Sequence, residues 1–154
     1  MDIQKRRRMA VTALYDLSRR GTLWLVLNTV WKRVSPSFVI KPDRDGGPGY
    51  HAGLALGKRN LSDADTLFPM LVGTSKRSGA SLELSAVFAE SDEEAGKRAK
   101  RKTYFAIRPF KVTLDDFFSE DGRRQITPLP SKSRLTDDEL RRFNGFLMKY
   151  GLRL

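Results

Sequence analysis

The sequence predicts one α+β domain that is mainly β and has helices at both ends. Three observations support this prediction. Most apolar residues lie in short runs that end in glycine or polar residues, as is typical of buried strands. Residues 136–151 have the pattern of an amphipathic helix, and apolar residues in the basic segment 1–34 recur at helical spacing. With 154 residues, the chain is long enough to bury a core without disulfides or metals.

Residues 1–34 are predicted to form a basic, helical N-terminal extension. The segment carries eight Lys or Arg side chains against two acidic ones, and Trp24 and Trp31 lie seven residues apart, which is a helical spacing. Gly21 either divides the segment into two helices or ends a helix before a strand, because residues 23–27 are equally consistent with a buried strand. We expect both tryptophans to pack in the core or an interface rather than to stack on bases.

The rest of the chain, residues 35–154, is predicted to be a single β domain that ends in a helix. A glycine-rich loop at 46–49 precedes the second predicted strand, where glycine permits sharp backbone turns. Residues 90–102 change from acidic to basic and are predicted to form a solvated loop or a short helix. The predicted strands cover residues 38–40, 51–57, 67–72, 80–88 and 103–107, the last continuing into or pairing with 110–114.

The C-terminal helix, at 136–150, has the clearest signals in the chain. Thr136 and Glu139 form a capping box, in which the hydroxyl caps the helix start and the carboxylate reaches back to it. Gly151 stands where a helix C-terminus favours glycine. One apolar face is predicted to pack on the sheet and consists of Leu140, Phe143, Leu147 and Tyr150.

Charge and composition narrow the classes of partner. The formal net charge is +11, which favours a polyanion such as RNA or an acidic protein over a purely solubilising role. The chain has no cysteine, so disulfides and cysteine-based zinc sites are excluded and a reducing compartment is expected. With one histidine, a conventional zinc site is not expected either. No signal peptide is evident, and the apolar run 23–30 is too short to cross a bilayer. We therefore expect a cytoplasmic protein with no membrane association.

The order of motifs between residues 38 and 76 is the most informative for function. A strand at 39–43 leads into the glycine loop, His51 opens an aliphatic strand, and a further strand ends at Thr74. His51 and Thr74 are 23 residues apart (74 − 51). This order and spacing, followed by a C-terminal helix, resemble those of the MazF/PemK-type toxins over residues 38–154.

The resemblance implies a small SH3-like β-barrel and a metal-independent endoribonuclease that cleaves single-stranded RNA by attack of a 2′-hydroxyl. It also implies a homodimer and an acidic antitoxin protein as partners. The chain departs from the family pattern at four places, one of which is that Thr74 lies further past Pro69 than is usual in the family. The others concern two substitutions and the N-terminal segment. His51 stands where the family has its catalytic arginine, Ala52 stands where it has a proline, and residues 1–37 have no counterpart in the minimal barrel.

The candidate catalytic residues are His51 and Thr74. The pKa of a histidine lies near neutrality, so His51 suits transfer of a proton, and the Thr74 hydroxyl suits a hydrogen bond to phosphate. Cations on the same face would neutralise charge on the RNA backbone. No cofactor and no metal is expected. The predicted RNA- or phosphate-binding residues are Ser75, Lys76, Arg77, Lys41, Arg44, Lys58 and Arg59.

Three alternatives remain open at the level of the sequence. A single histidine beside a glycine loop is as consistent with a structural role as with catalysis. Without the family arginine, the same barrel would serve as a non-catalytic nucleic-acid-binding module. The basic N-terminal segment with its tryptophans also suits a protein-interaction or inhibitor domain, because arginine and aromatic residues anchor many interfaces.

Overall fold

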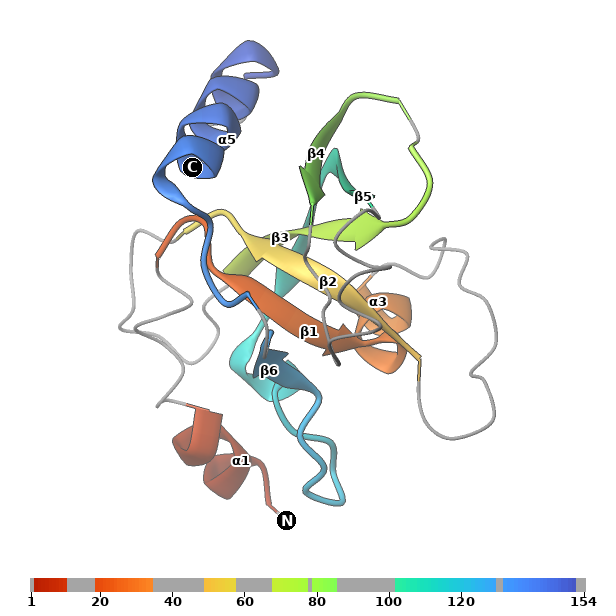
Figure 1. Ribbon diagram of the computed structural model, residues 1–154. Helices are drawn as coiled ribbons and strands as arrows, with labels where there is room; N and C mark the ends of the chain where they lie inside the picture. The colour runs from red at the N-terminus through yellow and green to blue at the C-terminus, as the bar shows by residue number, and fades with distance from the viewer. Residues whose placement is uncertain are drawn as a thin grey trace.

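The computed structural model describes residues 2–10, 19–34, 49–57, 68–77, 79–85, 102–129 and 132–151. These residues form a mainly β structure with helices, as the sequence predicts (Figure 1). In chain order, its elements are α1 (Ile3–Ala10), β1 (Leu23–Leu27), α3 (Asn28–Val34), β2 (Tyr50–Ala55), β3 (Phe68–Thr74), β4 (Ser81–Ser85), β5 (Lys102–Val112), the 3-10 helix η2 (Leu114–Asp116), β6 (Ile126–Pro128) and α5 (Asp137–Lys149).

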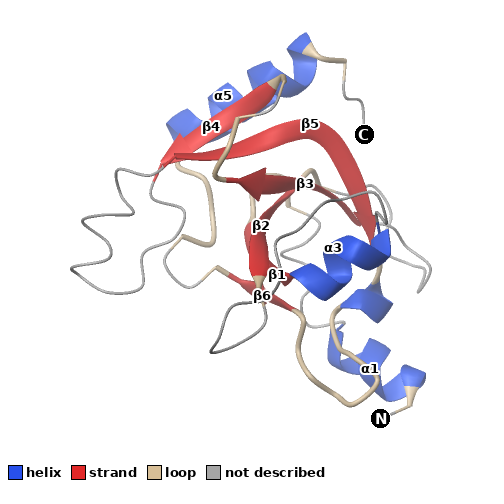
Figure 2. Ribbon diagram, turned by 90° about the vertical axis from the view of Figure 1, so that its right-hand side faces the viewer, coloured by secondary structure: helices blue, strands red, loops and turns tan. Residues whose placement is uncertain are grey.

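The strands form one six-stranded sheet in the order β4-β5-β3-β2-β1-β6, with every neighbouring pair antiparallel. The long strand β5 bends across the sheet and pairs with both β3 and β4 (Figure 2). Within the described residues no pairing joins the edge strands β4 and β6, so the sheet is open. The α+β class is therefore confirmed, whereas the closed SH3-like barrel remains an expectation.

Residues 23–27 form strand β1, whereas the whole segment 1–34 was predicted to be a helical extension. It is an inner strand that pairs with β2 on one side and β6 on the other, and α3 follows it directly. Trp24 thus lies on a strand and Trp31 on a helix, so the prediction of a helical spacing between them is wrong. Both tryptophans are fully buried, as expected from the size of their apolar rings. Residues 23–34 are consequently part of the sheet and its packing, not an appendage.

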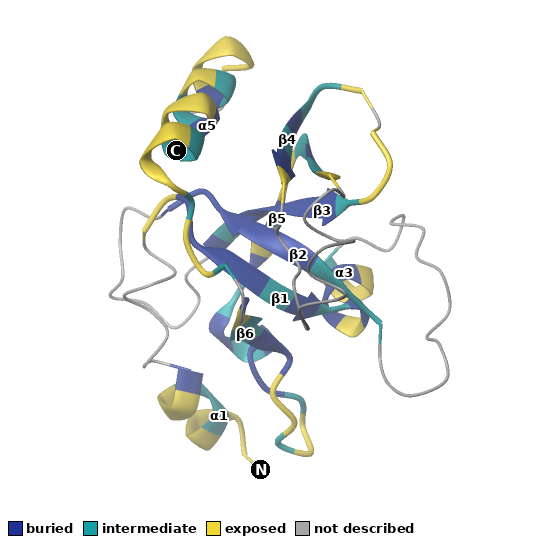
Figure 3. Ribbon diagram, viewed as in Figure 1, coloured by how far each residue is buried: buried dark blue, intermediate teal, exposed yellow. Residues whose placement is uncertain are grey.

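Helices cover both faces of the sheet, and each face has its own apolar core. One core contains Trp24, Trp31 and the neighbouring residues of α1, α3 and η2, while the other contains Phe143 and Leu147 of α5. Figure 2 shows α5 on one side of the sheet and α1 and α3 on the other. The strands between them are buried over most of their length (Figure 3). An inner strand covered on both faces explains why residues 23–27 read as a continuous apolar run.

Glycine at position 53 allows α3 to lie close to the sheet. A Cβ atom at Gly53 would come within 2.9 Å of Met70 Sδ and 3.2 Å of a Val26 methyl, with the Trp31 ring at 3.5 Å. Real Cβ contacts are essentially never shorter than 3.0 Å, so a side chain here would displace this packing. The bare backbone of β2 therefore provides the space in which the Trp31 ring packs.

Most of the predicted strands are confirmed where the structure describes them. The predictions at 51–57 and 67–72 correspond to β2 and β3. The predicted segments 103–107 and 110–114 join in the single strand β5, which ends at Val112, so that Leu114 already lies in η2. The predicted strand at 80–88 corresponds to β4, which is described only up to Ser85. The predicted strand at 38–40, most of the glycine loop and the segment 90–101 lie outside the described residues.

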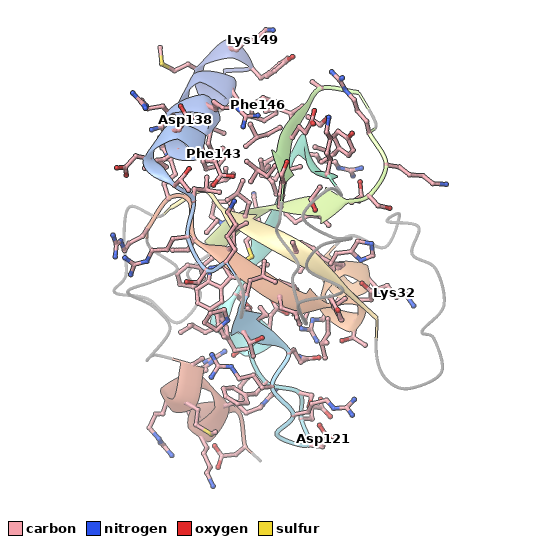
Figure 4. The ribbon with its side chains drawn as sticks, viewed as in Figure 1. Lys32, Asp121, Asp138, Phe143, Phe146 and Lys149 are labelled. Atoms are coloured by element: carbon pink, nitrogen blue, oxygen red, sulfur yellow. The ribbon has the colours of Figure 1, made fainter. Side chains whose placement is uncertain are left out.

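Helix α5 begins with the predicted capping box. The Thr136 hydroxyl accepts a hydrogen bond from Glu139 N–H at 3.2 Å, and Glu139 Oε1 accepts one from Thr136 N–H at 3.0 Å. Phe143 and Leu147 are buried against the sheet, whereas Tyr150 is largely exposed. In Figure 4, Lys149 lies at the far end of the helix, where a cation interacts favourably with the helix dipole.

Replacement of Thr136 by alanine is expected to lower the free energy of unfolding by about 1 kcal/mol. The change removes the hydroxyl acceptor at the helix start and leaves the Glu139 N–H without that partner. Urea denaturation of Thr136→Ala beside Thr136→Ser measures the difference. The serine variant keeps the hydroxyl and should remain close to the parent. Equal stability of all three proteins would contradict the assigned cap.

Candidate functional site

His51 lies on β2, on the face of the sheet that α3 covers. It pairs with Val26 of β1, whose side chain belongs to the core beneath α1 and α3. Because side chains alternate along a strand, His51 shares this face with Gly53, the position against which Trp31 packs. The His51 side chain is half-buried, so the ring lies at the boundary between this core and solvent.

The strand register places Thr74 beside His51. Strands β2 and β3 pair as Ala52 with Gly73 and Gly53 with Val72, and one further step in this antiparallel register sets His51 opposite Thr74. Residues opposite each other in neighbouring antiparallel strands point to the same face and have Cβ atoms about 4.5–5.5 Å apart. Two residues that are 23 positions apart in sequence are therefore neighbours across the sheet.

His51 and Thr74 begin a row of side chains that crosses the sheet on one face, and this row continues onto β5 and β4. Thr74 pairs with Tyr104, and Tyr104 pairs with Glu83, so all three face the same side as His51. Glu83 forms an ion pair with Lys102, with Nζ and Oε1 2.7 Å apart. The row therefore provides an imidazole, an aliphatic hydroxyl and a phenol in succession, with an ion pair at its outer end. Sequence analysis did not identify Tyr104, because only the pairing of β5 with β3 brings it to this row.

The beginning of α3 holds His51 through two hydrogen bonds. His51 Nδ1 lies 2.7 Å from Asn28 Oδ1, and the Trp31 indole N–H donates to the His51 carbonyl at 3.4 Å. Asn28 is almost fully buried at the junction between β1 and α3. No local pattern predicts this contact, because Asn28 is an ordinary polar residue at the end of an apolar run.

Burial lowers the pKa of His51 below its ordinary value of 6.5. Removing an imidazole from water disfavours its charged form, and desolvation is the cause of this shift. At pH 7 the ring is therefore neutral and able to accept a proton. A neutral imidazole beside a hydroxyl is suited to general base chemistry.

The lowered pKa of His51 predicts a loss of stability in mild acid. Below pH 6.5 the unfolded chain binds a proton at His51 that the folded chain excludes, so stability falls as the pH drops from 6.5 toward the lowered value and is unaffected above it. Urea denaturation at pH 7.5, 6.5 and 5.5 measures this slope. His51→Gln, which has no titrating ring, should flatten the slope. An unchanged slope in that variant would contradict the assignment.

The strand end after Thr74 is polar and accessible. The Thr74 hydroxyl donates a hydrogen bond to the carbonyl of Lys76 at 2.8 Å, which fixes a tight turn directly beyond β3. Ser75, Lys76 and Arg77 are all exposed along this turn. To bond a phosphate oxygen, which accepts hydrogen bonds, the Thr74 hydroxyl would donate to it in place of the Lys76 carbonyl. The two cations lie within three residues of Thr74 in sequence.

The other predicted phosphate-binding residues, Lys41, Arg44, Lys58 and Arg59, lie outside the described residues. Within the described part of the chain, no cluster of three or more His, Asp or Glu side chains could hold a metal ion. Across the same residues, no helix is both long and apolar enough to span a membrane. Of the predicted site residues, the structure describes His51, Thr74 and the turn 75–77, and the pairing of β5 with β3 adds Tyr104 as a candidate.

A second polar region joins α1 to η2. Arg7 binds both carboxylate oxygens of Asp115, at 2.6 and 2.9 Å, and Arg33 of α3 binds Asp116. Arg7 thereby holds the pKa of Asp115 below its usual value. An open hollow of about 650 Å³ lies beside these ion pairs, and Asp121 lies at the tip of the adjoining loop (Figure 4). The two adjacent aspartates have different arginine partners and therefore serve to attach helices to η2.

Comparisons with known proteins give no assignment: no family model matches the chain, and neither the curated proteins nor the solved structures give a significant match.

Proposed function

We propose that the protein is a toxin-like, metal-independent endoribonuclease that cleaves single-stranded RNA, with its site at His51 and Thr74. The observation that supports this most strongly is the register of β2 and β3, which pairs Ala52 with Gly73 and, continued by one residue, brings His51 opposite Thr74. Their chemistry and their spacing in the sequence predict both residues independently of the strand pairing. The net charge of +11 favours a polyanionic substrate.

The proposed reaction needs two proton transfers and stabilisation of negative charge. Neutral His51 takes the proton from a ribose 2′-hydroxyl, whose oxygen then attacks the adjacent phosphorus. The bond from phosphorus to the 5′-oxygen breaks, which leaves a 2′,3′-cyclic phosphate and a 5′-hydroxyl. The leaving oxygen takes its proton from an acid, for which the Tyr104 phenol is the nearest candidate in the row. No electron is transferred and no co-reactant is consumed.

Stabilisation of the phosphorane is assigned to the turn beyond β3. Exposed Lys76 and Arg77 would offset the developing negative charge, and Ser75 and Thr74 provide hydroxyl groups. The family arginine is absent from position 51, so these cations would supply the charge that it provides in MazF/PemK-type toxins. Lys41, Arg44, Lys58 and Arg59 are proposed to follow the RNA backbone away from the site.

Other features implied by the resemblance belong to the same proposal. They are the closed SH3-like barrel, a homodimer, an acidic antitoxin partner and a cytoplasmic location. The absence of cysteine supports a reducing compartment, and the basic charge supports an acidic partner.

A non-catalytic nucleic-acid-binding module is the second candidate. The bond between His51 and Asn28 favours it, because a half-buried histidine bonded to a buried amide also suits a structural role. In that case the exposed cations at 76 and 77 would still bind phosphate, with affinity falling steeply as salt increases.

Incubation of the purified protein with a long RNA in EDTA separates these candidates, provided that the product ends are mapped. Cleavage that yields 2′,3′-cyclic phosphate and 5′-hydroxyl ends would support the endoribonuclease. Intact RNA with a salt-sensitive gel shift would overturn it in favour of the binding module. Intact RNA with no shift would overturn both and favour a protein-interaction domain.

A further inference from the structure

Asn28 lies in a rigid position next to the imidazole of His51. It is the first residue of α3 and is only 6% exposed. Its backbone N–H donates to the Gly49 carbonyl at 2.9 Å, and the preceding N–H of Leu27 donates to Gln125 at 3.0 Å. The backbone is therefore held from two sides, which leaves the Asn28 amide little freedom to move away from His51.

The Asn28–His51 contact determines which ring nitrogen carries the proton. An amide oxygen can only accept a hydrogen bond, so at 2.7 Å from Asn28 Oδ1 the His51 Nδ1 must donate. In the neutral ring, Nε2 then holds the lone pair and is the atom that accepts a proton. Free histidine favours the opposite tautomer, with the proton on Nε2. The contact thus selects the form of the ring that presents its basic nitrogen away from α3.

An amide at position 28 is uncharged, so it orients the His51 ring without favouring the protonated imidazolium form. A carboxylate in the same place would stabilise the imidazolium and raise the pKa of His51. Val26, which pairs with His51 from β1, and Trp31, which donates to the His51 carbonyl from α3, carry no charge. The two charged residues of α3 do not change this, because Lys32 is exposed and Arg33 binds Asp116.

We infer that Asn28 is a positioning residue that fixes the Nδ1–H tautomer and the orientation of His51, so that Nε2 is the catalytic base. The effect of Asn28 on RNA cleavage rests on the proposed function, whereas its effect on the tautomer of His51 is independent of that function. Asn28 would act through His51 without touching RNA. Its loss should therefore reduce kcat and leave KM nearly unchanged.

Imidazole nitrogen NMR tests the inference directly, because His51 is the only histidine in the chain and its signals are unambiguous. The native protein should show a protonated Nδ1 and an unprotonated Nε2 at pH 7.5. Asn28→Ala should shift the ring toward the Nε2–H tautomer. Asn28→Asp, which keeps an oxygen acceptor and the side-chain size, should retain the tautomer and raise the pH midpoint of the titration. Thr29→Ala is the matched control, because it removes the neighbouring bond to Gln125 without touching His51.

An Nε2–H tautomer in the native protein would overturn the inference, as would an unchanged tautomer and midpoint in both Asn28 variants. In cleavage assays, Asn28→Ala should lose roughly ten-fold in kcat, a part of the contribution of general base catalysis, while Thr29→Ala should match the parent. Asn28→Asp should keep activity and move the pH profile upward. If the NMR result holds and no RNA is cleaved, the positioning role stands and the proposed function fails.

Discussion

Replacement of His51 by alanine is expected to lower the rate of RNA cleavage by about 100-fold or more, the usual contribution of a positioned general base. The neutral ring takes the 2′-hydroxyl proton in the proposed reaction, and the Tyr104 phenol, which pairs with Thr74 across the sheet, is assigned to the leaving oxygen instead. Thr74→Ala should have a smaller effect, since the hydroxyl contributes hydrogen bonding to phosphate but takes no proton. Single-turnover cleavage of a short RNA at saturating protein measures both.

Ser75→Ala is the companion to the Thr74 variant, because it removes the other hydroxyl assigned to phosphate binding, from the exposed turn rather than from the strand. Thermal denaturation should show that all variants remain folded at the assay temperature. Full activity in both His51→Ala and Thr74→Ala would remove these residues from the active site. Loss in Ser75→Ala equal to that in Thr74→Ala would show that the turn as a whole, and not the row on the sheet, is responsible.

Replacement of Trp31 by alanine should lower the free energy of unfolding by about 3–5 kcal/mol, a large part of the roughly 5–15 kcal/mol that a domain has. The ring is fully buried and packs edge-on against Phe110, with ring centroids 5.5 Å apart. It also fills the space above Gly53 and donates to the His51 carbonyl. A cavity at this point would loosen α3 from the sheet.

Urea denaturation followed by far-ultraviolet circular dichroism measures this loss. Trp31→Phe is the matched control, since it keeps an aromatic ring in the core and should lose clearly less stability than the alanine variant. If Trp31→Ala changed the free energy of unfolding by less than about 1 kcal/mol, the packing of α3 on β2 would be wrong. If Trp31→Ala remained folded but His51 no longer kept its proton on Nδ1, the rest of α3 as well as Asn28 would be needed to position the ring.

The sequence predicted the parts of the fold that have strong local signals. The capping box at Thr136 defines the start of α5, and short apolar runs define β2 and β3. Residues 23–34 were harder to assign because β1 is covered on both faces, so its apolar run lacks the alternation that separates strands from helices. Its place between β2 and β6 depends on contacts with distant segments, which local patterns do not contain.

The candidate site was predictable from chemistry only in part. His51 is the sole histidine and Thr74 ends a recognisable strand, so both could be nominated from the sequence. Asn28 and Tyr104 are common residue types with no distinctive spacing. They join the site because β1 leads directly into α3 and because β5 pairs with β3, which are features of the tertiary structure.

The position of β1 also changes how the N-terminal segment should be tested. Deletion of residues 1–34 would remove an inner strand together with Trp24 and Trp31, so loss of any function in that variant would reflect unfolding. Charge reversal on the exposed side of α1, at Lys5 and Arg8, is the better test of an interaction surface there.

The most direct test of the account is a titration of the isotope-labelled protein with a 2′-O-methylated RNA, which binds but cannot supply the attacking hydroxyl. The NMR signals of the His51 ring and of the backbone amides of Thr74, Lys76 and Arg77 should shift together and saturate at one RNA concentration. Binding that leaves His51 and Thr74 unperturbed, with shifts confined to another surface, would contradict it.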